Sequence, residues 1–138
     1  PRTVKPEEFS DNILGLSFAF VETYMQAQRA EASELDQICG IGYRKALEFL
    51  VKDYLCHKFP DEEENIKKES LGKNLNRIED GKVQTLAKRA TWIGNDETHY
   101  VRKHEDLDVG TMKTFIRAMV HFIDSDLTFE QALTIDPA

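Results

Sequence analysis

The sequence contains few of the residues that break helices. Seven glycines and four prolines are spread over 138 residues, too few turn-forming residues for a fold of many short strands. No stretch alternates apolar and polar residues as strands do, and no internal repeat is present. We therefore expect an all-α fold, an up-and-down bundle of about four to five main helices. We expect a single helical-bundle domain over residues 12–135 after an irregular lead-in over residues 1–11.

Long apolar runs and closely spaced cysteines are also missing. The most apolar stretch, residues 13–21, is far shorter than the ~20 residues that span a bilayer, so we expect no membrane partner. Cys39 and Cys56 fall on one expected helix, too far apart to form a disulfide with each other. Two free thiols fit a reducing compartment, so we expect a cytoplasmic protein. Because the chain begins with Pro1, we expect it to belong to a longer protein.

The charge is acidic overall and unevenly distributed. A formal charge of −7 excludes a protein that coats nucleic acid indiscriminately. Residues 65–104 nevertheless contain nine basic and five acidic residues, so this segment carries +4 and the remainder −11. Clustering of this degree is common on solvated helices, and by itself it assigns no ligand.

Apolar residues at helical spacing predict the main elements. We expect long helices over residues 12–30, 35–58, 82–92 and 109–124, and short ones over residues 61–68, 71–78 and 129–133. The helix over 35–58 is apolar around most of its circumference, so we place it at the centre of the bundle. We expect Gly94 to end or bend the helix before it, with a loop over residues 100–110.

The densest group of chemically active side chains lies over residues 92–100. Asn95 and His99 stand four residues apart and share one face if the helix continues through Gly94. An imidazole exchanges protons near neutral pH, and an amide can orient it or bind a phosphate oxygen. With nearby cations this set would suffice for metal-independent RNA cleavage, the cations being Arg89, Arg102 and Lys103. The alternative is that Asn95 and His99 only cap a helix end and hold the loop.

Other candidates have structural interpretations beside functional ones. Arg44, Glu48 and Lys52 follow at intervals of four residues and form a charged ladder. The alternative is that Arg44 points at the Asn95/His99 segment and helps to bind an anion. Trp92 is interpreted as a core anchor, with base stacking as the alternative. The other histidines and the carboxylates lack the spacing of metal ligands, so we expect neither a metal nor another cofactor.

Two segments together resemble a known family. Residues 42–48 (GYRKALE) and 93–99 (IGNDETH) are similar to the Arg-x-x-Leu-Glu helix and the Gly-Asn-x-x-x-His turn of a bacterial family of unknown function. That family looks like a branch of the HEPN superfamily (higher eukaryotes and prokaryotes nucleotide-binding domains). The resemblance covers residues 35–125. It implies a helical bundle that often dimerises.

The resemblance also implies two classes of function. Active HEPN members are metal-independent RNases in which four to six residues separate an arginine from the histidine that follows it; others bind nucleotides or proteins without catalysis. His99 carries over, but the arginine does not, because residues 92–94 are Trp, Ile and Gly. We therefore expect a binding and homodimerisation module that contacts RNA, a nucleotide or a protein within a bacterial defence or regulatory protein. Its site would comprise Asn95, His99, Arg44, Glu48 and Trp92. The alternative is a metal-independent endoribonuclease in which His99 is the general acid/base.

Overall fold

The computed structural model describes residues 2–101 and 108–137. These residues contain no strand, which confirms the all-α class, but the helices outnumber the expectation. Over these two ranges the chain forms seven α-helices and one 3-10 helix: α1 (Asp11–Leu16), α2 (Phe18–Ala32), α3 (Asp36–Lys58), η1 (Pro60–Glu62), α4 (Glu63–Lys68), α5 (Leu71–Leu75), α6 (Gly81–Asp96) and α7 (Val109–Leu133).

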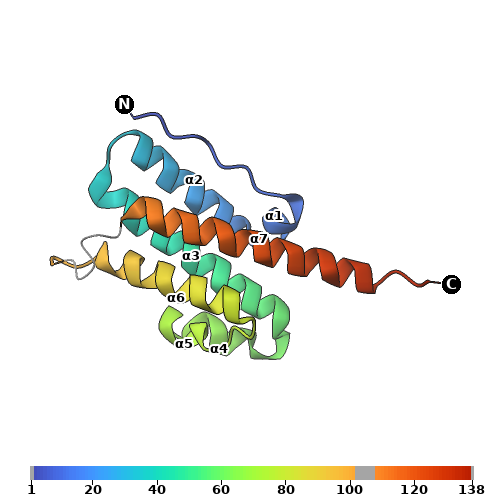
Figure 1. The fold of residues 1–138 in the computed structure, drawn as a ribbon. Helices are drawn as coiled ribbons and strands as arrows, with labels where there is room; N and C mark the ends of the chain where they lie inside the picture. The colour runs from blue at the N-terminus through green and yellow to red at the C-terminus, as the bar shows by residue number, and fades with distance from the viewer. Residues whose placement is uncertain (1, 102–107, 138) are drawn as a thin grey trace.

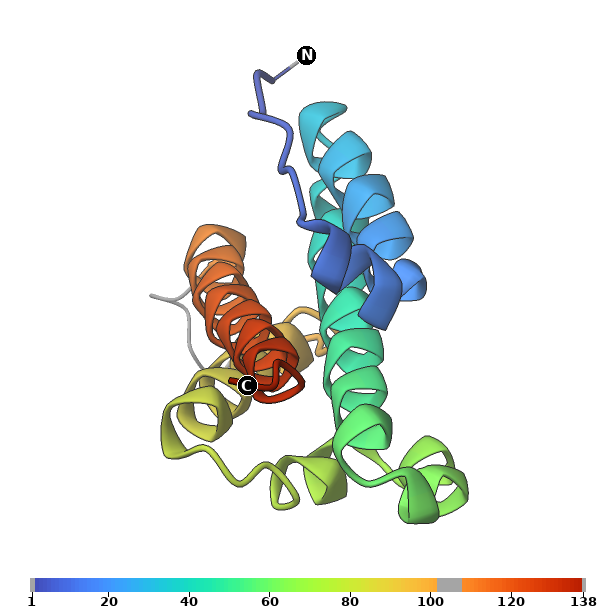
Figure 2. The same cartoon turned by 90° about the vertical axis from the view of Figure 1, so that its right-hand side faces the viewer.

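Helix α3 forms the centre of the molecule, as its apolar circumference predicted. It contacts every other helix. In Figure 1, α2 lies above α3, α6 lies below it and α7 crosses in front. Helices α2 and α6 run from right to left in that view, and α3 and α7 run from left to right. Figure 2 shows that α6 and α7 share one side of α3 while α2 packs on another.

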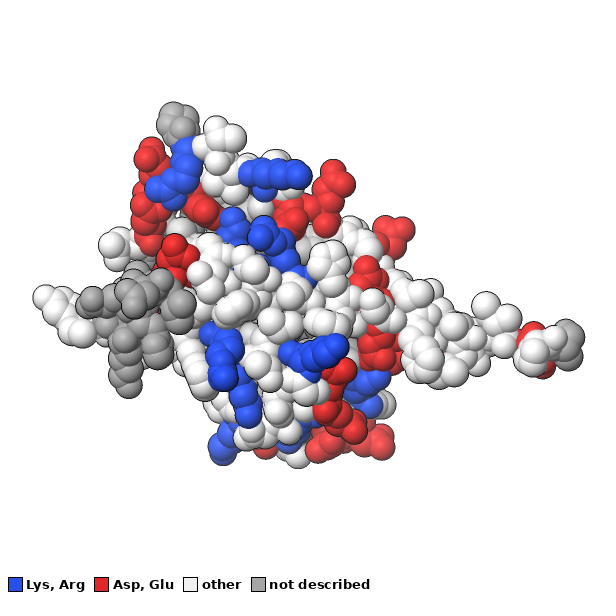
Figure 3. Space-filling model, viewed as in Figure 1, with Lys and Arg blue, Asp and Glu red and all other residues white. Residues whose placement is uncertain are grey.

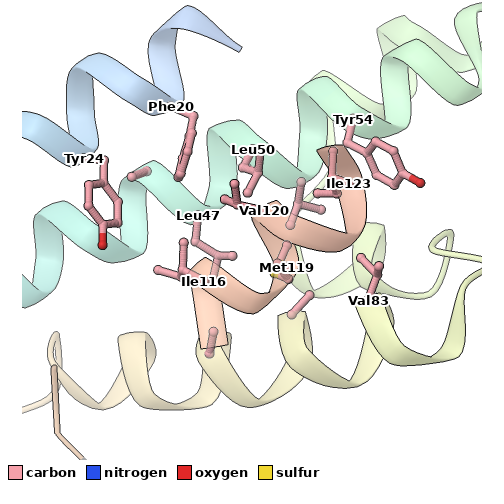
Figure 4. Close-up of a cluster of buried hydrophobic side chains, with 14 of the residues drawn as sticks. Phe20, Tyr24, Leu47, Leu50, Tyr54, Val83, Ile116, Met119, Val120 and Ile123 are labelled. Carbon is pink, nitrogen blue, oxygen red and sulfur yellow. The ribbon is translucent and has the colours of Figure 1, made fainter. Parts of the chain in front are cut away.

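The core lies between the four long helices. Figure 4 shows Phe20 of α2, Leu47 and Leu50 of α3, Ile116 of α7 and Val83 of α6 directed into it, and none of the five is more than 2% exposed. Each buried side chain of this size contributes about 1.5–3 kcal/mol relative to exposure. Packing of these faces, more than helix propensity, therefore holds the helices in place.

The expected helix over residues 12–30 is divided at Ser17, so that prediction was wrong about continuity. Ser17 adopts a non-helical backbone (φ −149°, ψ 81°). Its hydroxyl accepts a hydrogen bond from the backbone N–H of Phe20 at 3.2 Å, which caps the start of α2. The same hydroxyl donates to Asp53 on α3. A side-chain partner on another helix thus fixes the break, and the apolar pattern along 12–30 could not reveal it.

Two further boundaries differ from the expectation. Helix α6 continues through Gly94 to Asp96, so the prediction that Gly94 ends or bends the helix was wrong. Helix α7 begins after its N-cap Asp108 and runs unbroken to Leu133, so the prediction of a separate last helix over 129–133 was also wrong. Helix α5 begins after Ser70, whose hydroxyl caps it by accepting from the N–H of Lys73 at 3.2 Å.

The lead-in is irregular, as expected, and follows α2 in Figures 1 and 2. The N–H of Arg2 donates to the carbonyl of Ala32 at 2.9 Å. The side-chain amide of Gln28 donates a hydrogen bond to the carbonyl of Lys5 at 3.2 Å and accepts one from the N–H of Glu7 at 3.3 Å. Among the described helices, none combines the length and apolarity needed to cross a bilayer.

Candidate functional site

The two segments of the sequence motif meet where α3 packs against α6. The Nε of Arg44 donates to Oδ1 of Asn95 at 3.3 Å. One of the terminal guanidinium nitrogens of Arg44 also forms an ion pair with Glu48, one turn further along α3. Arg44 is therefore directed at Asn95, which is one of the two arrangements expected for it, and the charged ladder is present as well. Its role in anion binding stays a prediction.

Gly94 makes this contact possible. A Cβ added to Gly94 would lie 2.4 Å from Cγ and 2.8 Å from Cβ of Arg44, closer than real atoms approach. At Gly40, a single turn before Arg44 on α3, an added Cβ would lie 2.3 Å from the carboxylate of Glu97, so the side chain of Glu97 lies against this glycine. Gly94 thus allows a close approach of α3 and α6. The role of Gly94 is packing rather than turn formation.

The ladder continues from Arg44 to α4. Glu48 lies 2.9 Å from Nζ of Lys52, and that ammonium donates to the carbonyl of Lys67 at 3.3 Å. Burial disfavours the charged form of Glu48, but the hydrogen bonds from Lys52 and Arg44 outweigh it and lower the pKa of Glu48. Its carboxylate therefore stays ionised and neutralises Arg44. The positive charge that an anion would meet here is correspondingly reduced.

His99 does not join this group. Helix α6 ends at Asp96, so Asn95 and His99 do not share a helical face, and the N–H of His99 bonds to the carbonyl of Asp96 at 3.2 Å. The residue is exposed. Its imidazole makes no hydrogen bond within residues 2–101 and 108–137.

The surroundings of His99 are acidic. It lines an open hollow of about 650 Å³ at the end of the bundle where α3 and α7 begin. Five carboxylate side chains share this lining, and the described cation among them, Arg2, is already bound to Asp36 at 2.8 Å. The carboxylates are Glu31, Asp36, Asp96, Glu97 and Asp108. Glu31 is likewise paired, with Lys113 at 2.9 Å, so the hollow is rich in carboxylates whose charge is partly balanced.

Trp92 lies on the surface of α6 with Arg89. The indole is 46% exposed, so the interpretation of Trp92 as a core anchor was wrong. The guanidinium carbon of Arg89 lies 4.4 Å from the centroid of the indole ring, within the range of a cation–π contact. The side chain of Arg89 thus covers part of one face of the Trp92 ring, and its positive charge lies beside the indole.

Helix α6 also has the largest excess of basic over acidic residues among the described helices. It carries Lys82, Lys88 and Arg89, and its sole acidic residue is the buried Asp96 near its end. None of the three cations forms an ion pair with another residue of the described part of the chain. Lys82 instead lies 5.6 Å from the ring of Phe122. Figure 3 shows blue side chains over α6, separated mainly by uncharged residues.

Arg102 and Lys103 lie outside the described residues. No three His, Cys, Asp or Glu side chains within the described ranges are placed to hold a metal. Cys39 and Cys56 are free thiols, and burial raises the pKa of both, which lowers their reactivity.

One polar cluster was missed in the sequence. Glu31 of α2 accepts a 2.6 Å hydrogen bond from the hydroxyl of Tyr43 and pairs with Lys113 of α7 at 2.9 Å. Burial, followed by this hydrogen bond, raises the pKa of Tyr43. The side chains of Glu31 and Lys113 are only 18% and 12% exposed. Their separation by 82 positions left no local signal.

Comparisons of the chain with protein-family models, with curated proteins and with solved structures gave no match.

Proposed function

We propose that this chain is a HEPN-like binding module that contacts single-stranded RNA, or a nucleotide of the same chemistry, through the outer face of α6. This basic–aromatic face comprises Lys88, Arg89 and Trp92. The observation that carries the proposal is the exposed indole with a guanidinium 4.4 Å from its centroid. It combines a stacking surface for a base with a charge for a phosphate.

The energetics favour a ligand that has both a base and a phosphate. Stacking of a base on an aromatic side chain contributes about 1–3 kcal/mol and tolerates any base. Cations that are not held by carboxylates attract phosphates, and here the nearest acidic residue of α6 is buried. Because the whole chain carries −7, binding would be confined to this face and would weaken steeply with salt.

The bundle and the motif contact support the HEPN-like aspect of the proposal. The four long helices alternate in direction (Figure 1), as in an up-and-down bundle. The Arg-x-x-Leu-Glu helix supplies Arg44, and the Gly-Asn segment supplies its partner Asn95. In this proposal these residues fix α6 against α3 and so position the basic–aromatic face. The module would work within a bacterial defence or regulatory protein.

The intrinsic fluorescence of Trp92 tests the proposal directly, because it is the only tryptophan. Titration with a short oligouridylate at low salt should quench this fluorescence to saturation. Arg89→Ala and Lys88→Ala should each weaken binding by about five- to tenfold, equivalent to roughly 1–1.4 kcal/mol. Trp92→Ala, followed by the anisotropy of labelled RNA, should lose at least as much.

A matched control is Phe18→Ala, which removes an aromatic ring that is 64% exposed on α2. It should bind the RNA like the parent chain. Absence of quenching at low salt would refute the proposal, as would equal affinity of the Trp92→Ala and parent chains.

The exposed imidazole of His99 favours a second candidate, a metal-independent endoribonuclease. A general acid/base must be reachable by the substrate, and His99 lies at an open hollow. Active HEPN members carry an arginine before the histidine, and residues 92–94 of this chain are Trp, Ile and Gly instead. We therefore rank the enzyme below the binding module.

A further inference from the structure

Helix α3 carries a second pair of a cation and an aromatic ring. The ammonium of Lys45 lies 5.9 Å from the centroid of the Phe49 ring, within the range of a cation–π contact. Lys45 is exposed and Phe49 is half-buried. Like Arg89, Lys45 forms no ion pair with another residue of the described part of the chain. Helix α3 therefore repeats the combination that Arg89 and Trp92 form on α6.

Both pairs border the contact between α3 and α6 on the same side of the molecule. The guanidinium of Arg44 binds Asn95 of α6 at 3.3 Å and Glu48 of α3, so Asn95 and Glu48 mark one side of this contact. Trp92 stands three residues before Asn95, and Lys45 stands three residues before Glu48. Residues three apart are neighbours on a helix surface, so the two pairs flank the Arg44 cluster.

A groove of about 380 Å³ opens beside the pair on α3. Three lysines, two carboxylates and one aromatic ring line it: Lys45, Lys52, Lys67, Glu48, Asp53 and Phe49. Glu48 is already bound to Lys52 at 2.9 Å and to Arg44, and Lys67 pairs with Glu63 at 2.6 Å. Lys45 is therefore the cation of this groove that a phosphate would meet, beside a ring that a base could contact.

The opposite flank of α6, towards α7, offers a similar pair in a less favourable setting. The ammonium of Lys82 lies 5.6 Å from the ring of Phe122, but Phe122 lines a hollow with three carboxylates and two cations. Both of these cations already form ion pairs. The carboxylates are Glu79, Asp80 and Asp126, and the cations are Lys58 and Arg77. Charge therefore favours the α3 flank over the α7 flank for a phosphate.

We propose that the ligand of the basic–aromatic face is a single-stranded RNA of several nucleotides that crosses the α3–α6 contact. One base stacks on Trp92 and another contacts Phe49 in the groove, while Lys88 and Lys45 bind phosphates between them. This inference rests on the proposed function, and of its two ligand classes it selects an RNA strand over a mononucleotide.

The separation of the two rings requires a strand. The axes of packed helices lie about 8–10 Å apart. At 3.6 residues per turn, Trp92 is turned about 160° from Gly94, and Phe49 is turned about 140° from Arg44. Each ring thus lies on the flank of its helix away from the contact, and one nucleotide cannot reach both. Single-strand-binding folds contact about four or more nucleotides, a length that can bridge the two pairs.

Titration of Trp92 fluorescence with a uridine dinucleotide and a uridine octanucleotide tests this path. The parent should bind the octanucleotide at least about thirtyfold more tightly, because the second pair adds contacts within one ligand. Lys45→Ala and Phe49→Leu should each weaken octanucleotide binding about fivefold and leave dinucleotide binding unchanged. Lys45→Ala should also reduce the slope of log affinity against log salt concentration by about 0.7, the value for one phosphate contact to a single strand. A merely structural role of Lys45 would not change this slope.

Lys82→Ala and Phe122→Leu are matched controls, because they remove the equivalent pair on the α7 flank, and both should bind the octanucleotide like the parent. Phe49 packs against the core, so circular dichroism and melting check that Phe49→Leu is folded; the exposed Lys45 gives a variant without this concern. Octanucleotide binding that ignores both α3 variants would overturn the path and leave the proposed RNA binding intact, as would losses confined to the two controls. Absence of quenching by either oligonucleotide would overturn both proposals.

Discussion

Arg44 on α3 and Asn95 on α6 are joined by a hydrogen bond of 3.3 Å between Nε and Oδ1. The stem of Arg44 lies against Gly94, the residue that precedes its partner. Both residues of the Gly-Asn segment therefore contact Arg44. Gly94 leaves room for its aliphatic side-chain carbons, and the side-chain oxygen of Asn95 accepts a hydrogen bond from its guanidinium group.

Gly94→Ala should lower the free energy of unfolding by about 1–3 kcal/mol, because the new methyl group would collide with Cβ and Cγ of Arg44 in a packed interface. The gain in helix propensity, about 1 kcal/mol, offsets only some of this. Chemical denaturation measures the change. Gly15→Ala is the control, since no atom lies within 4 Å of the added Cβ, and it should be neutral or stabilising. Equal stability of the Gly94→Ala and parent chains would contradict this account of Gly94.

The pKa of Glu48 predicts a specific pH dependence. Its ordinary value is 4.5, and the folded chain lowers it. The ion pairs of Glu48 therefore stabilise the fold fully above 4.5, and this contribution disappears as the pH falls through the lower folded value. Glu48→Gln should unfold more easily at pH 7, and its difference from the parent should shrink as the pH falls below 4.5. Thermal melts from pH 7 to pH 2 give the comparison, with Glu22→Gln, at an exposed position of α2, as the control. A difference that stayed constant with pH would argue against the ion pairs as its source.

Apolar spacing was sufficient to predict the helical class and the central place of α3. The same spacing also indicates that Trp92 is exposed. The inward residues of α6 include Val83, Ala87 and Ala90, and the next position in that pattern is Gly94 rather than Trp92. Trp92 lies off the apolar face, so its 46% exposure follows from helix geometry. The interpretation as a core anchor relied on residue type instead.

Other features depend on contacts between distant segments of the chain. Ser17 divides α1 from α2 while its hydroxyl donates to Asp53 on another helix. The carboxylates around His99 are brought together where α2, α3, α6 and α7 meet. Such arrangements have no local pattern, so the sequence could indicate His99 as a candidate but not the charge that surrounds it.

The buried pair of Glu31 and Lys113 should show strong coupling. Lys113→Met should destabilise the fold by roughly 3 kcal/mol, because it leaves a mostly buried carboxylate without its cation. Glu31→Gln should also be destabilising. The double variant should lose less than the sum of the two single losses, by about 1–2 kcal/mol. Urea denaturation of the four chains measures this coupling. Additive losses would mean that the ion pair contributes little beyond the packing of its side chains.

His99 gives the test that separates a binding module from a ribonuclease. In the binding module, a 5′-labelled single-stranded RNA incubated with the parent chain in EDTA should stay intact, because residues 92–94 lack the arginine that active HEPN members use beside the histidine. His99→Ala should keep the RNA affinity of the parent and its stability within about 0.5 kcal/mol, since the side chain is exposed. The control is Trp92→Ala, which should lose affinity at unchanged stability. Metal-independent cleavage by the parent that disappears in His99→Ala would reverse the ranking. His99 would then be the general acid/base, and its cation would have to come from outside the described lining of the hollow.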